Sequence, residues 1–442
     1  MRASKFVLSN TAADYSAAMI AQELPGKLTF CDGGIYVGKS IGYRIPVFLD
    51  IESLINPHIS IMGTTGSGKT HLSKVLLAGY AIDKGYNVIV LDWNGEYCRS
   101  VEDIGGKVYK LGEVDRVSVF EIFKNLKEAV RFISEQSGLN DDEHAALYRM
   151  FKPDQRKKKK TYAQVLKSSK DSNRQIKKKL GSILSLGALE DGGISLEALS
   201  CGVVSIDLSA VASYEDKGFY SKMVLKGILS NMYISGRKDN IERILILDEA
   251  WKHIANDNDI GKFFRESRKY GFGIIATSQL ASDLKNDIIG NSACFFVFKL
   301  QNDSDIKALS SAGITGDHSP AELNRGECIF SVSFKAYEQP YSAVISIMPG
   351  DLNKVFCIRS GNMEKHISKA DFEKMLRDYF DDGNKAHDVV KSIESADNAV
   401  DVEALVVGLK EAGLSRANIL LFLSELGIDE IFSMDVYNAV GH

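Results

Sequence analysis

The sequence lacks the features that would place the chain in a membrane or in an oxidising compartment. No apolar run reaches about 18 residues, the length needed to cross a bilayer, and no apolar stretch near the N-terminus resembles a secretion signal. The six cysteines are widely spaced and include no C-x-x-C pair. We therefore expect a cytoplasmic protein with reduced thiols, without a disulfide framework or zinc site, that reaches a membrane only through a partner.

An excess of positive charge is also missing. The 54 lysines and arginines are outnumbered by 58 acidic residues, which gives a formal net charge of −4. Proteins that coat nucleic acid are often basic overall, so this balance argues against simple coating but permits a basic channel inside an acidic shell. The sequence has no internal repeat, and its 442 residues suffice for two or three domains.

Short apolar runs that alternate with helical patterns predict an α/β fold. The runs occupy residues 59–62, 87–91, 203–208, 244–247, 273–277 and 294–298. Because these runs are continuously apolar rather than alternating, they indicate a parallel sheet that is covered on both faces. Before them, residues 1–57 contain short β-rich runs separated by Gly and Asp, which predict a small β module.

Two segments do not show this alternation of apolar runs and helical patterns. Residues 122–200 are predicted to form a helical insertion, in which Phe151 to Leu180 carry 12 Lys and Arg against two Asp. Residues 361–442 are predicted to form a helical tail, with 8 Lys and Arg against 16 Asp and Glu. An acidic tail is unsuited to DNA phosphates, so we expect it to dock a partner or pack against the core.

The strongest motif predicts a nucleotide phosphate site between the run 59–62 and the helix that follows it. The motif is G-x-x-x-x-G-K-[ST], and its residues, with the adjacent His71, are Gly63, Thr64, Thr65, Gly66, Ser67, Gly68, Lys69 and Thr70. Backbone N–H groups and the helix N-terminus are expected to cradle the phosphates of ATP. Lys69 would reach the β- and γ-phosphates, and Thr70 would ligate Mg²⁺.

Two carboxylates follow the apolar run 244–247, at the end of a strand where ligands of open α/β sheets bind. Asp248 is expected to hold Mg²⁺, and Glu249 to orient or deprotonate the attacking water. Gln279 ends the run 273–277 and is expected to sense the γ-phosphate.

Further candidates lie on either side of these carboxylates. Asp92 and Glu96 follow the run 87–91 and could join the metal shell or compete with Glu249 for the water, although Asn94-Gly95 also suits an ordinary turn. Arg265 and Arg268 could act as arginine fingers, in their own subunit or across a subunit interface, although surface arginines are common.

These motifs together resemble the HerA/FtsK group of translocases, and most closely its HerA branch. The resemblance rests on the P-loop, the Gly95-Glu96-Tyr97 trailer, Asp248-Glu249-Ala250 and the run 265–271 leading to Gln279, and it covers roughly residues 25–360. It implies a RecA-like ATPase core in residues 58–121 and 201–360 behind an N-terminal β-barrel. It also implies a hexamer that threads double-stranded DNA and partners a nuclease or another effector.

One position departs from the HerA pattern. An Arg-His pair is expected before the P-loop strand, with the arginine serving the neighbouring subunit, but this chain has Pro57-His58. Another arginine, such as Arg44 or Arg265, would then have to take that role.

Two other functions remain open. Leu247 to Lys252 and the Ala-Thr-Ser-Gln run ending at Gln279 are also similar to ATPases of type IV secretion and conjugation, which favours a DNA-uptake or secretion motor at a membrane channel. A ring scaffold gated by nucleotide and holding an effector is the second alternative. The Asp248-Glu249 pair argues against it, because a switch without turnover needs no catalytic base.

Overall fold

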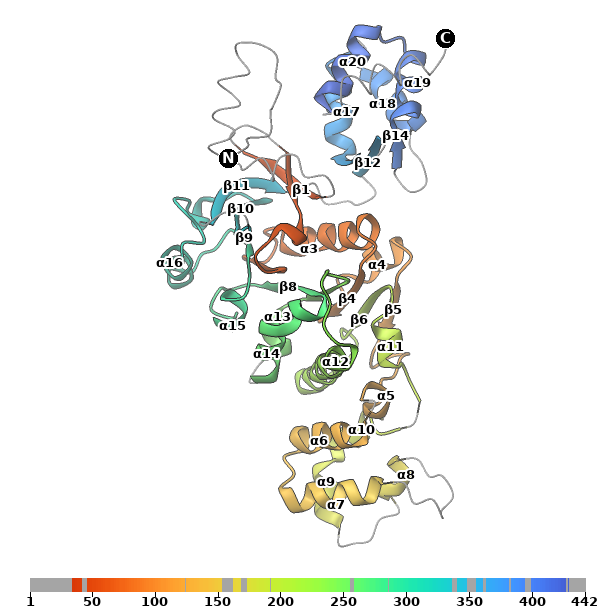
Figure 1. Ribbon diagram of the computed structural model, residues 1–442, viewed down its shortest axis with the longest axis vertical. Helices are drawn as coiled ribbons and strands as arrows, with labels where there is room; N and C mark the ends of the chain where they lie inside the picture. The colour runs from red at the N-terminus through yellow and green to blue at the C-terminus, as the bar shows by residue number, and fades with distance from the viewer. Residues whose placement is uncertain are drawn as a thin grey trace. The chain divides into compact units, whose positions relative to one another are not determined.

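The computed structural model describes residues 34–428 apart from 42–45, 124, 153–161, 168–172, 191, 255–257, 285, 336–339, 348–354, 361–362, 381–382, 394–398 and 427. The chain divides into two compact units (Figure 1). The larger unit contains Ile51–Ser342, and the smaller one combines Met1–Asp50 with Ala343–His442.

A mostly parallel sheet forms the centre of the larger unit. Its strands lie in the order β10-β9-β3-β8-β7-β4-β6-β5, in which β10 is antiparallel to β9 and the other neighbours are parallel. The strands are β3 (His58–Met62), β4 (Asn87–Asp92), β5 (Lys107–Lys110), β6 (Val203–Asp207), β7 (Arg243–Leu247), β8 (Phe272–Ser278), β9 (Cys294–Phe298) and β10 (Glu327–Val332).

Continuous apolar sequence explains why these strands occupy the centre. Every residue of β3, β8 and β9 is buried, and only the first residues of β4, β6 and β7 are partly exposed. A strand buried on both faces has no polar alternation, which is the pattern expected of parallel sheets. The predicted α/β fold with a large, mostly parallel sheet is therefore confirmed.

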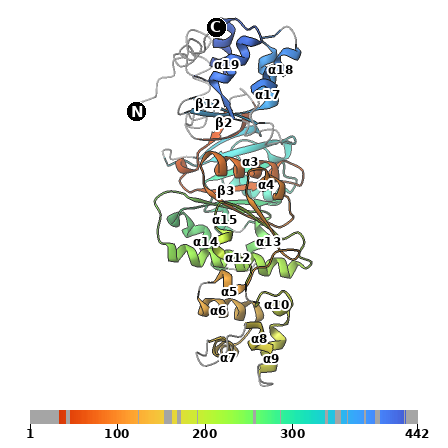
Figure 2. The ribbon, with the colours of Figure 1, turned by 90° about the vertical axis from the view of Figure 1, so that its right-hand side faces the viewer.

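Helices cover both faces of this sheet. Figures 1 and 2 show α3 and α4 on one face and α12, α13 and α14 on the other. The helices that flank the strands are α3 (Lys69–Ala78), α4 (Cys98–Asp103), α12 (Tyr214–Ser235), α13 (Ala250–Ile254), α14 (Asn258–Glu266), α15 (Asn286–Ile289) and α16 (Asp303–Ser311), with short helical turns η1 (Ile51–Ser53), η2 (Gly79–Asp83), η4 (Ser267–Tyr270) and η5 (Pro320–Glu322).

In the described part of the segment between β5 and β6, which was predicted to be a helical insertion, seven short helices are present. They are α5 (Val119–Ile122), α6 (Leu126–Ser137), α7 (Asp141–Phe151), α8 (Tyr162–Lys167), α9 (Arg174–Lys179), α10 (Gly181–Ser185) and α11 (Leu196–Leu199). Helix α6 is tied to α12 by an ion pair of 2.8 Å between Glu135 and Lys226. Within the basic stretch, Lys179 pairs with Glu143 at 2.6 Å, whereas residues 156–160 lie outside the described residues.

Among its described residues, the smaller unit contains two groups of paired strands and four helices. Antiparallel pairs join β1 (Ile35–Ser40) to β2 (Pro46–Leu49) and to β11 (Tyr341–Ile347). A second sheet has the order β13-β12-β14, formed by β12 (Val355–Ser360), β13 (Met363–Ser368) and β14 (Ala399–Asp401). The helices are α17 (Lys369–Arg377), α18 (Gly383–Ile393), α19 (Val402–Glu411) and α20 (Arg416–Glu425).

The C-terminal region corrects one expectation and leaves another open. Residues 361–442, predicted to be a helical region, contain the helices α17 to α20, but they also contain the strands β13 and β14, which were not expected. Charged residues interrupt β13, so its sequence lacks the apolar run by which the core strands were found. Most of the predicted N-terminal barrel, including Arg44, lies outside the described residues, and the barrel stays a prediction.

Among the helices that the structure describes, none combines the length and the apolar character needed to cross a membrane.

His58 occupies the start of β3 and is a core residue. The backbone N–H of Ile274 donates to its Nδ1 at 3.2 Å, and its Nε2 lies 2.9 Å from the carbonyl oxygen of Phe264. An amide N–H can only donate and a carbonyl oxygen can only accept, so the ring is neutral with its proton on Nε2. Burial lowers the pKa of His58 to about 4. Pro57, where an arginine was expected from the resemblance, is also buried.

We predict that His58 makes the protein less stable in mild acid. Its pKa is about 4 in the folded chain, below the ordinary value of 6.5, so only the unfolded chain gains a proton as the pH falls between these values. The loss reaches about 3 kcal/mol by pH 4, from roughly 1.4 kcal/mol per pKa unit.

Urea unfolding between pH 7.5 and 5 measures this effect, with His58→Gln as the comparator. Glutamine keeps a donor and an acceptor but does not titrate, so the variant should show a shallower loss of stability below pH 6.5. The same slope in both proteins would contradict the assignment. The other fully buried histidine, His253, also has its pKa lowered to about 4 by burial and accounts for part of the slope that remains.

Candidate active site

The predicted site residues that follow β3, β4, β7 and β8 lie at one edge of the sheet. Neighbouring strands in the order β3-β8-β7-β4 are parallel, so their carboxyl ends meet there. This is the edge where ligands bind in open α/β sheets. The edge carries the P-loop after β3, Asp92 to Glu96 after β4, Asp248 and Glu249 after β7, and Gln279 after β8.

The P-loop connects β3 directly to α3. Lys69 is the first residue of α3, and its Nζ donates to the carbonyl oxygen of Thr64 at 3.1 Å. Glycine is required at position 63, because a Cβ there would lie 2.5 Å from that of Phe298. Gly68 has φ of 127°, a value that other residues rarely adopt. The loop therefore has the tight backbone that a phosphate cradle requires.

The remaining P-loop residues are positioned to contact an anion. Ser67 Oγ is buried without a hydrogen-bond partner in the described structure, which is costly unless a ligand or water supplies one. Thr65 and Gly66 are exposed at the tip of the loop, and Thr70 and His71 lie partly exposed in the first turn of α3. An unpaired hydroxyl within a cradle of backbone N–H groups fits a phosphate ligand.

A single hydroxyl connects the Asp248 carboxylate to the backbone of Glu249. The Oγ1 of Thr277, on β8, accepts the backbone N–H of Glu249 at 3.0 Å and donates to Asp248 Oδ1 at 3.2 Å. Glu249 has φ of 51°, the only positive value among the described residues other than glycine. Such a conformation is uncommon and persists where surrounding bonds fix it.

Side chains from two directions hold the Glu249 carboxylate. Gln279 Nε2 donates to Oε1 at 2.8 Å, and Trp251 Nε1 donates to Oε2 at 3.2 Å. The prediction placed Gln279 at the nucleotide site, and the structure brings it into contact with Glu249. Thr277 was not singled out from the sequence, although its place two residues before Gln279 on a buried strand could have suggested it.

Burial and mutual repulsion dominate the electrostatics of the site. Asp248 is 4% exposed, and burial, followed by the charges of Asp92, Glu96 and Glu249, raises its pKa to about 7. Burial lowers the pKa of Lys69, while Glu249 and Asp248 oppose that shift. Several carboxylates close to one lysine form a site that favours a divalent cation, because a cation would stabilise their charged forms.

The contacts of Asp92 favour the turn, the alternative that its sequence left open beside a place in the metal shell. Its Oδ1 accepts the backbone N–H groups of Gly95 and Glu96 at 2.8 and 3.0 Å, and its Oδ2 accepts that of Tyr97 at 2.8 Å. These three bonds close the turn after β4, and they compete with any metal for both oxygens. Asp92 therefore shapes the loop that carries the exposed Glu96.

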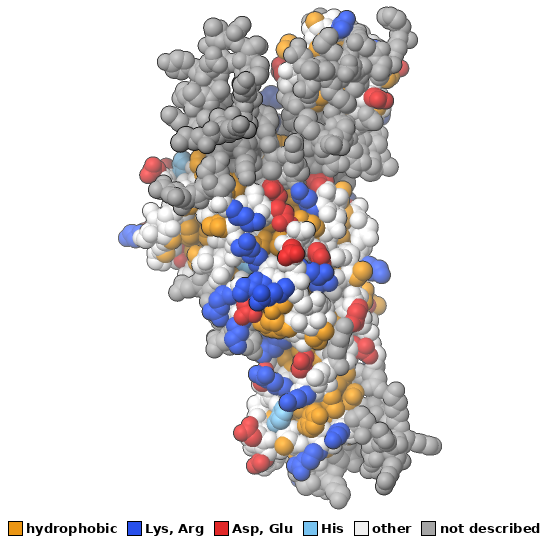
Figure 3. Space-filling model, in the orientation of Figure 1, with side chains coloured by type: hydrophobic (Ala, Val, Ile, Leu, Met, Phe, Trp, Pro, Cys, Tyr) orange, Lys and Arg blue, Asp and Glu red, His pale blue; other side chains and the backbone are white. Residues whose placement is uncertain are grey.

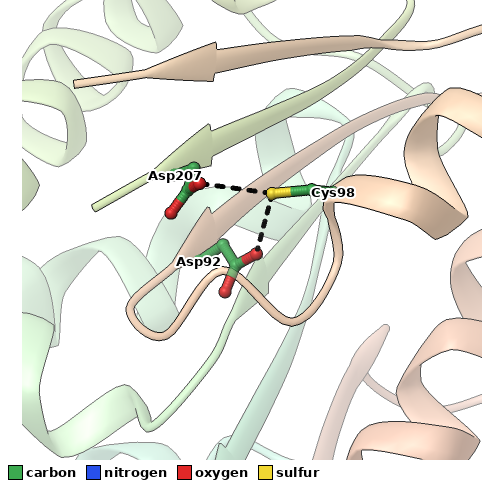
Figure 4. A group of neighbouring side chains, drawn as sticks. All are labelled: Asp92, Cys98 and Asp207. Atoms are coloured by element: carbon green, nitrogen blue, oxygen red, sulfur yellow. Dashed lines mark hydrogen bonds between the residues drawn. The ribbon is translucent and has the colours of Figure 1, made fainter. Parts of the chain in front are cut away.

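Cys98 and Asp207 also contact the turn after β4 (Figure 4). The thiol of Cys98 donates to Asp207 Oδ2 at 3.3 Å and lies 3.9 Å from Asp92 Oδ2. Burial raises the pKa of Cys98 to about 12, so the sulfur keeps its proton as a hydrogen-bond donor. Tyr97 hydrogen-bonds Ser73 on α3, which joins the turn to the P-loop helix. The sequence predicted no more than a reduced thiol at Cys98.

The predicted arginine fingers lie at the other edge of the sheet. Arg265 is in α14 and Arg268 in η4, both before the start of β8, and both are exposed. Arg268 Nη1 donates to the carbonyl oxygen of Ile55, which precedes β3. The five residues of β3 separate this edge from the P-loop by roughly 15 Å. This placement argues against action in the same subunit, and a role across an interface stays a prediction.

A segment that sequence analysis missed also reaches the P-loop. The backbone N–H of Gly326, in the turn before β10, donates to the carbonyl oxygen of Ser67 at 2.9 Å. Arg325 is exposed and adjacent to this contact. The contact joins residues 259 positions apart, so no local motif could have indicated it.

The three bonds to Asp92 yield a prediction for stability. Asp92→Ala leaves three N–H groups without their acceptor, and we expect a loss of about 2–3 kcal/mol in the free energy of unfolding. Glu96→Ala, a change of an exposed carboxylate on the same turn, should cost less than about 0.5 kcal/mol. Urea denaturation of both variants measures the difference. Equal effects would show that Asp92 does not hold the turn.

Several known proteins similar in sequence to this chain have names that refer to DNA. Residues 35–226 match the family described as the central domain of helicase HerA. The chain is 25% identical over 280 residues to the DNA import protein CedB of Sulfolobus acidocaldarius, covering 57% of this chain and 45% of CedB. It is 23% identical over 313 residues to the DNA double-strand break repair helicase HerA of Sulfurisphaera tokodaii, covering 63% of this chain and 62% of the relative. The chain thus spans less than two thirds of either relative.

The solved structure of VirB4 of Thermoanaerobacter pseudethanolicus has a similar fold. The TM-score is 0.52 at 19% identity, with 72% of this chain and 96% of VirB4 covered. At this identity the likeness shows the fold alone. The chain is therefore similar to HerA in sequence and to VirB4 in fold, which confirms both resemblances predicted from its motifs.

Proposed function

We propose that this protein is an ATP-driven motor that moves double-stranded DNA through a ring of identical subunits. The observation that carries the proposal is the convergence of Lys69, Asp248, Glu249 and Gln279 at the edge of the sheet, within a chain similar to HerA. A binding protein without turnover would have no need for a buried carboxylate held in a strained backbone beside the P-loop.

The site suggests how ATP would be cleaved. The P-loop amides and Lys69 would hold the phosphates, and Thr70 and Asp248 would hold Mg²⁺, which supplies charge neutralisation on the phosphate oxygens. Glu249 would orient or deprotonate the attacking water, and Gln279 would sense the γ-phosphate through its contact with Glu249. Loss of the γ-phosphate would change this contact and thereby move the elements attached to β8.

In a ring, each ATP site would receive arginine side chains from the neighbouring subunit. Arg265 and Arg268 are exposed and distant from their own P-loop, so they would serve a neighbouring subunit in a hexamer with ATP at each interface. A nuclease or another effector would use the motor. On the face shown in Figure 3, basic and acidic side chains are interspersed over the described part of the larger unit.

A DNA-uptake or secretion motor at a membrane channel is the second candidate. The sequence similarity to the DNA import protein CedB and the fold of VirB4 favour it. In that role the chain would reach the membrane through a partner. Stimulation of ATP hydrolysis by single-stranded DNA or by a membrane partner, without a response to duplex DNA, would favour this candidate.

The first experiment is ATP hydrolysis with and without linear duplex DNA. We expect duplex DNA to increase the rate, and we expect Glu249→Gln to reduce it by at least about 100-fold while ATP binding persists. Lys69→Ala should lose binding and hydrolysis together. Hydrolysis that ignores every form of DNA would contradict the motor and favour the nucleotide-gated scaffold.

The basic stretch of the insertion gives a separate prediction. If Lys157 to Lys160 contact the DNA backbone, reversing their charge should weaken DNA stimulation and reduce the salt dependence of DNA binding. Reversing the charge of Lys177 and Lys178 tests the second candidate cluster, Lys177 to Lys179 on helix α9, in the same way. Unchanged stimulation and salt dependence in the first variant would exclude residues 157–160 as the track.

A further inference from the structure

Trp251 makes a contact that packing alone does not explain. Its indole N–H, the only hydrogen-bonding group of the side chain, points at Glu249 Oε2 at a distance of 3.2 Å. The other oxygen of the same carboxylate accepts from Gln279. The two donors come from different elements, since Trp251 lies on α13 and Gln279 follows β8.

The indole itself is held in place by neighbours. The ring of Tyr214, the first residue of α12, lies 6.4 Å away between centroids, and Lys252 Nζ lies 5.6 Å from the centroid of the indole. Lys252 also lies 5.5 Å from the ring of Trp93, in the turn that Asp92 closes. The donor is therefore fixed by α12, α13 and the turn after β4.

Two fixed donors determine the orientation of a carboxylate. A glutamate side chain has three rotatable bonds, and one hydrogen bond leaves the carboxylate plane free to turn. A second donor on the other oxygen fixes that plane, and each oxygen keeps one position free to accept a proton. The backbone of Glu249 is already fixed by Thr277. The base is thus oriented before substrate arrives.

We propose that Trp251 is a positioning residue for hydrolysis, whose indole N–H sets the orientation of the Glu249 carboxylate toward the attacking water. The role rests on the proposed function, in which Glu249 activates that water. It adds a third polar contact to Glu249 beside Gln279 and Thr277, and it connects the base to α12 and to the turn after β4.

Trp251→Phe is the direct test, because phenylalanine keeps an aromatic ring and removes the donor. We expect kcat for ATP to fall about tenfold with KM unchanged, the size typical of losing an outer partner of a catalytic group. Tyr220→Phe is the matched control. Tyr220 lies on α12, the helix of Tyr214, and its hydroxyl donates to the carbonyl oxygen of Leu186, so the change removes an aromatic donor that does not touch Glu249. An unchanged kcat in Trp251→Phe, or a rise in KM alone, would overturn the proposal.

A double-mutant cycle separates positioning from general packing. If Trp251 acts through Glu249, Trp251→Phe should not slow the Glu249→Gln variant any further, because the group it orients has gone. Independent factors that multiply in the double variant would overturn the proposal, since a packing defect would act whether or not the base is present.

Fluorescence tests the same contact without any turnover. The chain has two tryptophans, so Trp93→Phe leaves Trp251 as the only one. In that background, Glu249→Ala removes the acceptor of the indole N–H and should shift the emission, whereas Glu96→Ala should leave it unchanged. No shift, or equal shifts, would overturn the contact. If the purified protein hydrolyses no ATP, the proposed function fails, and this measurement still decides whether Trp251 touches Glu249.

Discussion

The burial of charge at the carboxyl edge of the sheet is the constraint on which the site depends. Asp92, Asp248 and Glu249 are each less than 10% exposed, and a buried carboxylate is costly unless hydrogen bonds or a cation stabilise it. Each of them is therefore tied to groups from neighbouring segments. Parallel strands bring these partners together, because they all end at the same edge.

The way each carboxylate is stabilised separates structural from chemical roles. Asp92 is satisfied by three backbone amides and leaves little capacity for a ligand, so its contribution is the shape of the turn. Asp248 receives the Thr277 hydroxyl at 3.2 Å and the Asn94 amide at 3.5 Å, both neutral donors. Its pKa is raised to about 7, which indicates a carboxylate that lacks a sufficient counter-charge. That shortage is what a divalent cation would relieve.

Local sequence predicted the parts of the site that depend on one strand and the turn after it. The P-loop, the pair after β7 and Gln279 each follow a continuous apolar run, and the run itself fixes the end of the strand. The role of Asp92 in closing the turn could not be predicted in this way, because an aspartate shortly before Asn-Gly can either bind a metal ion or accept the backbone N–H groups of a turn. For Arg265 and Arg268 the sequence left action in the same subunit and action across an interface equally open, since their distance from the P-loop depends on which edge of the sheet they occupy.

Local patterns in the chain were enough to predict the α/β class, the P-loop and the acidic pair, because these follow from continuous apolar strands and from glycines at fixed spacing. Three contacts became visible only in the folded chain: Thr277 bridges Asp248 and Glu249, Trp251 points its donor at the base, and Cys98 meets Asp207 across 109 residues. Those contacts depend on the order in which strands lie side by side. Strand order is a property of the packed sheet, and no local pattern in the chain encodes it.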